Sequence, residues 1–178
     1  SWVKPGLMAW DAWWSAGQPP TTNPGMSTAM LKRYIQFAAD MGWPYQLIDW
    51  WWYGEPNTPT SDPRKVSPDV DMEEVRRFAD ERGVKLWIWV RFNDLERFET
   101  AEEFFARMES WGMAGVKIDF MDRDDQEMVD WYERIAATAA KHQLMVNFHG
   151  AMKPTGMNRT WPNQITREGI LGNEYNKW

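Results

Sequence analysis

The stretch Gly115-Val-Lys-Ile-Asp-Phe120 is a short run of strand-forming residues that ends in an acid. Side chains alternate along a strand, so Lys117 and Asp119 are expected to lie on the same face. A carboxylate at the end of an apolar strand destabilises the fold unless it is paired or has a function. A helical pattern begins at about Asp124, so the stretch indicates one strand–helix unit.

The same strand–helix unit recurs along the chain. Strands are predicted at Leu7–Trp10, Tyr45–Asp49, Lys85–Val90, Val116–Phe120, Leu144–Phe148 and Ile170–Glu174. Helices are predicted over 27–41, closed by Gly42, over Asp69–Arg82, from Thr100 to Gly112 with Glu103 at capping-box spacing, and from Asp124 onward. Strands that alternate with helices indicate βαβ units and a parallel sheet.

Candidate functional residues fall at or just after the predicted strand ends: Asp49, Asp119, His149 and Glu174. A (β/α)8 barrel builds its active site on that side, whereas a doubly wound sheet would carry a Gly-rich phosphate turn, which is missing here. We therefore predict an α/β chain forming one incomplete (β/α)8 TIM barrel over residues 1–178. It would hold about the first six βα units, since a closed barrel needs eight strands.

The composition excludes several classes of function. The net charge of −6 and the lack of a basic stripe argue against a nucleic-acid partner. No apolar run approaches about 18 residues, so no membrane span is expected. The chain has no cysteine, which excludes disulfides and thiolate chemistry, and it has 14 tryptophans. Indole faces stack on sugar rings, although many of these tryptophans are also explained as core residues.

Several side chains could carry chemistry. Asp119 is either a nucleophile held ionised by Lys117 or half of a buried structural ion pair. Asp49 and the neighbouring Trp50 suit sugar binding, and His149 suits contact with a hydroxyl or a carboxylate. The acids of residues 122–125 are explained as a helix start, with Arg123 able to organise them.

Two glutamates, Glu168 and Glu174, are predicted to bracket the sixth strand. Together with nearby carbonyl oxygens they suit a hard cation such as Ca²⁺, and Glu174 could instead be a proton donor; surface acids are the alternative. Two carboxylates on different strand ends, an aromatic wall and the lack of a phosphate motif indicate glycoside hydrolysis.

These segments resemble glycoside hydrolase family 97, a family of α-glycosidases. The matching stretches are Val3–Gly6, Tyr45–Asp49, Val116–Gln126, Phe148–Gly156, Arg159–Asn163, Thr166–Gly169 and 173–178. The resemblance implies an N-terminal β-sandwich and a C-terminal β-domain, neither of which is expected within residues 1–178. It also implies Ca²⁺ held by Glu168 and Glu174, with Glu174 as the general acid.

The resemblance further implies a mechanism. Inverting α-glucosidase members carry a glutamate base where this chain has Gly150, whereas retaining α-galactosidase members carry glycine there and an aspartate nucleophile matching Asp119. Retention is therefore expected, with Asp119 and Glu174 about 5–5.5 Å apart. In this mechanism Lys117 and Arg123 keep Asp119 anionic, and the substrate is a terminal α-linked sugar of an oligosaccharide or other α-glycoside.

Three alternatives stay open at this point. They are an inverting α-glucosidase of the same family, a sugar-binding barrel without catalysis, and a fragment that is inert and poorly soluble because its sheet edges are open. The sequence does not separate galactose from glucose or a pentopyranose, and it does not give the oligomeric state. By family resemblance, the expected location is the bacterial periplasm or outside the cell.

Overall fold

A computed structural model describes residues 1–10, 25–98, 100–172 and 176. Its described residues form a six-stranded sheet in the order β1-β2-β3-β4-β5-β6, and every neighbouring pair of strands is parallel. The strands are β1 (Met8–Trp10), β2 (Tyr45–Ile48), β3 (Lys85–Arg91), β4 (Gly115–Asp119), β5 (Met145–Phe148) and β6 (Gln164–Arg167). Sequential parallel order is the arrangement of a (β/α)8 barrel, so the predicted partial barrel is confirmed.

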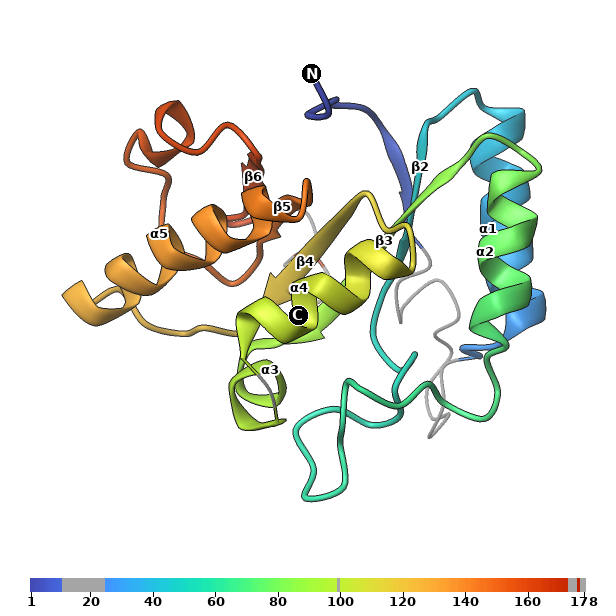
Figure 1. Cartoon of the computed structure of the whole chain (residues 1–178), viewed down its shortest axis with the longest axis horizontal. Helices are drawn as coiled ribbons and strands as arrows, with labels where there is room; N and C mark the ends of the chain where they lie inside the picture. Colours follow the sequence, from blue (N-terminus) through green and yellow to red (C-terminus); the bar gives the residue numbers. More distant parts are fainter. Residues whose placement is uncertain (11–24, 99, 173–175, 177–178) are drawn as a thin grey trace.

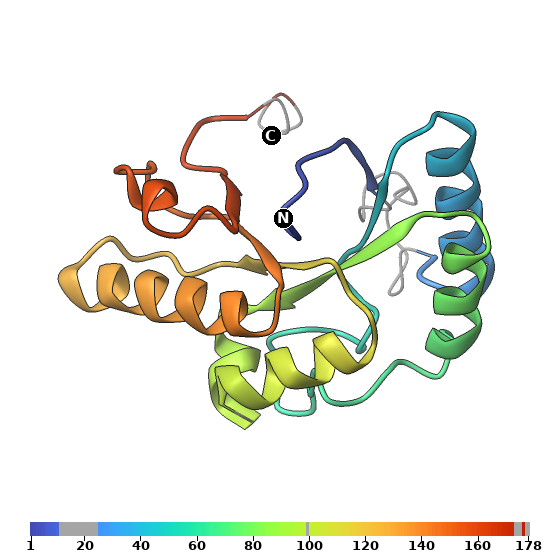
Figure 2. The same cartoon turned by 45° about the horizontal axis from the view of Figure 1, so that its top comes forward.

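Helices connect the strands and cover one face of the sheet. They are α1 (Thr28–Asp40), α2 (Met72–Asp80), α3 (Phe92–Phe98), α4 (Ala101–Ser110) and α5 (Gln126–Lys141), with a 3₁₀ turn η1 (Met157–Arg159). Figure 1 shows α1 and α2 beside β2 and β3, with α4 and α5 farther along the sheet. In Figure 2 the chain that follows β5 rises on the side of the sheet away from α4 and α5.

The caps that start and stop these helices agree with the sequence patterns. Thr100 and Glu103 form the predicted capping box at the start of α4. Asp125 caps α5, which confirms that part of the acid run is a helix start. Gly42 follows α1 with φ +67°, the left-handed conformation expected of a glycine after a helix.

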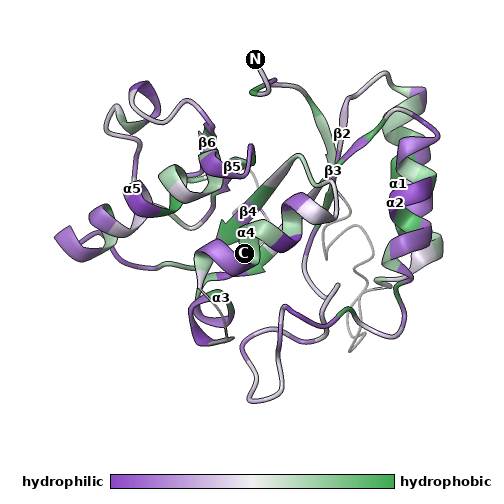
Figure 3. Cartoon of the chain, in the orientation of Figure 1, coloured by the Kyte–Doolittle hydropathy of each residue, from purple (hydrophilic) through white to green (hydrophobic). Residues whose placement is uncertain are grey.

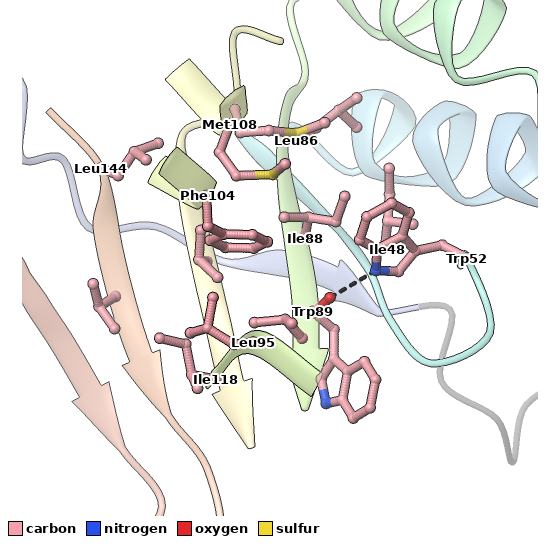
Figure 4. Close-up of a cluster of buried hydrophobic side chains, with 14 of the residues drawn as sticks. Ile48, Trp52, Leu86, Ile88, Trp89, Leu95, Phe104, Met108, Ile118 and Leu144 are labelled. Carbon is pink, nitrogen blue, oxygen red and sulfur yellow. Dashed lines mark hydrogen bonds between the residues drawn. The ribbon is translucent and has the colours of Figure 1, made fainter. Parts of the chain in front are cut away.

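The core lies between the sheet and the helices. Alternate residues of β3 and β4, such as Ile88 and Ile118, pack there against Leu95 of α3 and Phe104 of α4 (Figure 4). In Figure 3, α2 and α5 each carry apolar and polar stretches, as expected of helices with one buried face. No helix within the described ranges is both long and apolar enough to cross a membrane.

The opposite, inner face of the sheet carries the other alternate residues. Tyr45, Leu47, Trp87 and Met145 form a small separate cluster there. Because side chains alternate, this face also receives the residues at the odd positions of β4, Lys117 and Asp119 among them.

Two sequence predictions need correction. The sixth strand is Gln164–Arg167, not Ile170–Glu174: Ile170 and Leu171 are 71% and 79% exposed, and residues 173–174 lie outside the described ranges. The ladder ends because Gly169 turns the chain with φ +46°. Helix α3 was missed because it follows β3 directly, without the turn residues that mark other boundaries.

We predict that Gly115→Ala destabilises the protein. A Cβ at this position would lie 2.7 Å from the carbonyl oxygen of Met145 and 2.7 Å from ring carbons of Trp87. Overpacking of this kind costs about 1–3 kcal/mol. Urea unfolding of the intact protein measures the loss, with Gly172→Ala as the control, since a Cβ there meets nothing within 4 Å. Equal stability of the two variants would contradict the packing.

Candidate active site

The carboxyl ends of the strands bring three predicted residues together. Asp49 directly follows β2, Asp119 ends β4, and His149 directly follows β5. Parallel strands end at the same edge of a sheet, so these side chains project on the same side. The structure therefore places these three residues at one edge of the sheet, as the sequence predicted, and their role in catalysis or binding stays a prediction.

Asp119 is 4% exposed and is surrounded by donors. Its Oδ2 accepts a hydrogen bond from Nε1 of Trp89 at 2.9 Å, and its Oδ1 accepts one from the backbone N–H of Phe120 at 2.8 Å. Nδ1 of His149 lies 3.2 Å from the same carboxylate, and Nζ of Lys117 lies 3.7 Å from Oδ2. The carboxylate is thus held in one orientation.

These contacts decide the charge of Asp119. Burial by itself raises the pKa of the carboxyl, but the hydrogen bond with His149 and the positive charge of Lys117 lower it, helped by Trp89. The pKa therefore lies below its ordinary value, and Asp119 is an anion at neutral pH. A buried anion with this support is suited to act as a nucleophile.

Lys117 lies between two carboxylates. Its Nζ is 2.9 Å from Oδ2 of Asp49 and 3.7 Å from Oδ2 of Asp119, so Asp49 is the closer partner. The ammonium also lies 4.6 Å from the centre of the Trp10 ring. Asp49 in turn accepts hydrogen bonds from Nε1 of Trp10 and from the backbone N–H of Trp50. Asp49 therefore holds Lys117 in place beside Asp119.

Arg123 does not take part in this charge network. Its guanidinium binds Asp125 at 2.8 Å and Glu127 at 2.6 Å on the exposed start of α5. The expectation that Arg123 helps to keep Asp119 anionic is therefore not met. The arginine instead belongs to the helix start, as an acid run before a helix would suggest.

Glu168 follows β6 directly and reaches the same edge of the sheet. Its Oε2 accepts a hydrogen bond from the backbone N–H of Gly150 at 2.7 Å and lies 3.4 Å from Nδ1 of His149. His149 thus lies between Asp119 and Glu168. The other predicted acid, Glu174, lies outside the described residues, as does the neighbouring Asn173.

Gly150 lies close to Asp119 in a conformation that favours glycine. Its φ is +59°, which residues with a side chain rarely adopt. A Cβ there would lie 3.4 Å from Oδ1 of Asp119 and 3.3 Å from the backbone nitrogen of Phe120. A side chain at this position would therefore begin in contact with the carboxylate of Asp119 and the backbone of Phe120.

Strained backbone marks the ends of two strands. Trp51 has φ +81° after β2, and Phe120 has φ +63° directly after Asp119. Bulky residues seldom occupy this region, and such strain clusters at functional sites. The turn at Phe120 directs its N–H back onto the carboxylate of Asp119.

Sequence reasoning missed Trp89 as a site residue. The run Lys85–Val90 is apolar on both faces, so its composition did not show which residues point inward. Strand register was the usable signal, because β3 lies beside β4 and pairs Trp89 with Lys117. Trp50, which was predicted to bind sugar, is partly buried and stacks on Trp89 with a ring separation of 5.6 Å.

A cavity of about 210 Å³ opens on the inner face next to these residues. Its lining consists of Met8, Trp10, Leu47, Trp87, Lys117, Asn147 and His149. Apolar walls with a few convergent polar groups are typical of small-molecule sites. Among the described residues no group of three His, Asp or Glu side chains is placed to hold a metal ion.

A family model described as glycoside hydrolase 97 matches residues 10–170. The chain belongs to glycoside hydrolase family 97. The structure agrees, because this chain superposes with a TM-score of 0.85 on a variant of a family 97 enzyme from Pseudoalteromonas sp. strain K8. That pair is 28% identical, and the match covers 100% of this chain and 31% of the solved one.

Two curated relatives within family 97 are similar over nearly the whole chain. A probable retaining alpha-galactosidase of Streptomyces bingchenggensis is 41% identical over 98% of this chain. A retaining alpha-galactosidase of Bacteroides thetaiotaomicron is 36% identical over 100% of it. The chain spans only 27% and 26% of the lengths of these relatives.

We predict that Asp119 makes the unfolding free energy of this family 97 chain depend on pH in the acid range. The pKa of Asp119 in the folded protein lies below the ordinary value of 3.8. The stabilisation by the ionised carboxylate is therefore complete above about pH 4–5 and is lost as the pH falls through the folded pKa. The unfolding free energy of the wild type, relative to that of Asp119→Asn, should therefore decrease below about pH 4.

Urea unfolding at a series of pH values from about 6 to 2.5 provides the measurement. Asp130→Asn is the matched control, because Asp130 is exposed on α5 and bonds only Gln126 among the contacts described for it. A difference between wild type and Asp119→Asn that stays constant over this range would contradict the assignment of a lowered pKa.

Proposed function

We propose that this chain carries part of the active site of a retaining, exo-acting α-galactosidase, with Asp119 as the nucleophile and Glu174 as the acid/base. The observation that carries the proposal is the environment of Asp119: a buried carboxylate with a lowered pKa, beside a glycine at position 150. The names of the two curated relatives, both retaining alpha-galactosidases, support the same choice.

In the first step an oxygen of Asp119 attacks the anomeric carbon of the terminal sugar. The bond to the leaving oxygen breaks, that oxygen takes a proton from Glu174, and a covalent glycosyl-enzyme results. In the second step water attacks the anomeric carbon while Glu174 takes a proton from that water. The ester to Asp119 breaks, the carboxylate is restored, and two inversions give net retention.

Gly150 separates this mechanism from the inverting alternative. An inverting enzyme needs a second carboxylate that activates water on the face opposite the leaving group. Position 150 carries no side chain, and a larger residue there would contact Asp119 and the backbone of Phe120. The inverting alternative would therefore require a base from another position.

The remaining residues would bind the sugar or hold the nucleophile in position. Lys117 supplies a buried positive charge beside Asp119, and Asp49 fixes that ammonium. His149 is 22% exposed at its side chain and lines the cavity, so it can reach a hydroxyl while contacting Asp119. Trp50, stacked on Trp89, presents an indole at the same edge of the sheet.

The proposal includes Ca²⁺ held in part by Glu168 and Glu174. Glu168 fits this role because a carboxylate is a hard oxygen donor and its Oε2 is already oriented by the N–H of Gly150. Bound there, the ion would supply positive charge near the leaving oxygen. His149, 3.4 Å from Glu168, would stay on the side of the nucleophile.

The first test is the anomer that the intact protein releases from a p-nitrophenyl α-galactoside in the presence of Ca²⁺. Proton NMR at early times should show the α-anomer of galactose, since retention preserves the starting configuration. Initial release of the β-anomer would show inversion and remove Asp119 from the nucleophile's role. Cleavage of α-glucosides alone would overturn the choice of galactose.

Asp119→Asn should abolish this turnover, because an amide cannot form the glycosyl ester; we expect a loss of at least about 10⁴-fold. Asp130→Asn should leave kcat unchanged, because it makes the same chemical change on the exposed face of α5. Steady-state kinetics of the two purified variants gives the comparison. Normal turnover by Asp119→Asn would refute the nucleophile assignment.

We also predict that a chelator lowers turnover by at least about tenfold and that added Ca²⁺ restores it, since loss of the cation removes charge stabilisation worth several kcal/mol. Glu168→Gln should weaken Ca²⁺ binding measured by isothermal titration calorimetry, because a neutral oxygen replaces an anionic one. Unchanged Ca²⁺ affinity in Glu168→Gln would exclude this residue as a ligand.

A further inference from the structure

Trp89 is the buried residue that contacts Asp119 from the neighbouring strand. It lies near the end of β3, is 0% exposed, and donates its indole N–H to Oδ2 of Asp119 at 2.9 Å. Since no part of its surface is accessible, Trp89 cannot contact a substrate. Whatever it contributes must therefore act through Asp119.

Two aromatic rings stack on the indole of Trp89. The ring of Trp50 lies 5.6 Å from that of Trp89, with an angle of 4° between the planes. Tyr53 also stacks on Trp89, at 5.9 Å and 16°. A ring packed in this way cannot turn without disrupting both neighbours, so the direction of its N–H is fixed.

The backbone of Trp89 and the ring of Tyr53 are fixed as well. Nε1 of Trp52 donates a hydrogen bond of 2.6 Å to the carbonyl oxygen of Trp89 (Figure 4). The hydroxyl of Tyr53 donates to Asp94 at 3.0 Å, and Asp94 also accepts from Ser61 at 2.6 Å. Burial and the charge of Asp94 raise the pKa of Tyr53, so this hydroxyl keeps its proton.

We propose that Trp89 is the positioning residue of the nucleophile: its indole, packed against Trp50 and Tyr53, directs the N–H that fixes the carboxylate of Asp119 for attack on the sugar. The inference rests on the proposed role of Asp119. With Oδ1 held by the N–H of Phe120 and Oδ2 by Trp89, rotation about the last side-chain bond of Asp119 breaks both hydrogen bonds.

The same hydrogen bond serves both halves of the reaction. During attack it preserves the orientation of the carboxylate, which is a large part of the advantage of a bound nucleophile. During release of the sugar, negative charge returns to Asp119, and a fixed N–H donor stabilises that charge without reorganisation. Its removal should therefore lower kcat and leave substrate binding nearly unaffected.

The decisive comparison is Trp89→Phe with Trp131→Phe in the intact protein. Trp131 is also buried and also donates its N–H to a carboxylate, that of Glu96 at 2.9 Å, but it lies on α5. Each variant loses one buried indole and one charge-assisted hydrogen bond, so a general loss of packing should affect the two in similar ways.

Trp89→Phe should lower kcat about 10- to 100-fold, the value of one hydrogen bond to a charged group, without raising KM. Trp131→Phe should keep kcat within about threefold of the wild type. Equal kcat values for the two variants, or a loss in Trp89→Phe that lies only in KM, would overturn the proposal.

A second measurement needs no catalysis. The indole N–H resonance of Trp89, assigned by its absence from the spectrum of Trp89→Phe, should shift in Asp119→Asn because a neutral amide replaces the charged acceptor. The resonance of Trp131 should stay in place. If the Trp89 resonance is unaffected, the hydrogen bond does not exist in solution and the proposal fails.

These outcomes separate this inference from the proposed function. Normal turnover by Asp119→Asn would remove the nucleophile, whereas an inactive Asp119→Asn with a fully active Trp89→Phe would remove only the positioning role. If Trp89→Phe fails to fold, a benzothiophene analogue of tryptophan at position 89 keeps the ring shape and removes only the N–H. Full kcat in that protein would also overturn the inference.

Discussion

The parallel alignment of six strands is the constraint on which the candidate site depends. Because β1 to β6 run in the same direction and in sequential order, all of them end at one edge of the sheet. Residues far apart in the sequence, such as Asp49 and His149, thereby reach the same small region. The site therefore needs no long loop to assemble it; the sheet itself brings the functional groups together.

Within the site, the buried carboxylates of Asp49 and Asp119 need positive charge and hydrogen-bond donors beside them. The ammonium of Lys117 lies between Asp49 and Asp119. The N–H groups of Trp10, Trp89 and two backbone positions donate to the same carboxylates, and His149 contacts Asp119. Unpaired, either carboxylate would be strongly destabilising. Here the pairing leaves Asp119 ionised and oriented, which is the state required of a nucleophile.

The sequence was sufficient for the alternation of strands and helices, the barrel class and the residues at three strand ends, since these follow from periodicity and caps. The sequence was not sufficient for features that depend on contacts between residues far apart in the chain. The run Ile170–Leu171 is apolar but exposed. The true sixth strand, Gln164–Arg167, is more polar, and its pattern did not show that Arg167 is buried against Tyr132 of α5 and Phe148 of β5. The role of Trp89 required knowledge of strand register.

The contact between Lys117 and Asp49 also spans β3, since the two residues belong to β4 and to the end of β2. Neighbouring strands lie about 4.8 Å apart, so the two chains are separated by about twice that distance, and the side chains approach each other over the inner face. The length of this contact therefore depends on how strongly the sheet is curved. A substitution that flattened the sheet, even beneath a distant helix, would separate the ammonium from its carboxylates and disable the chemistry without touching any residue that performs it.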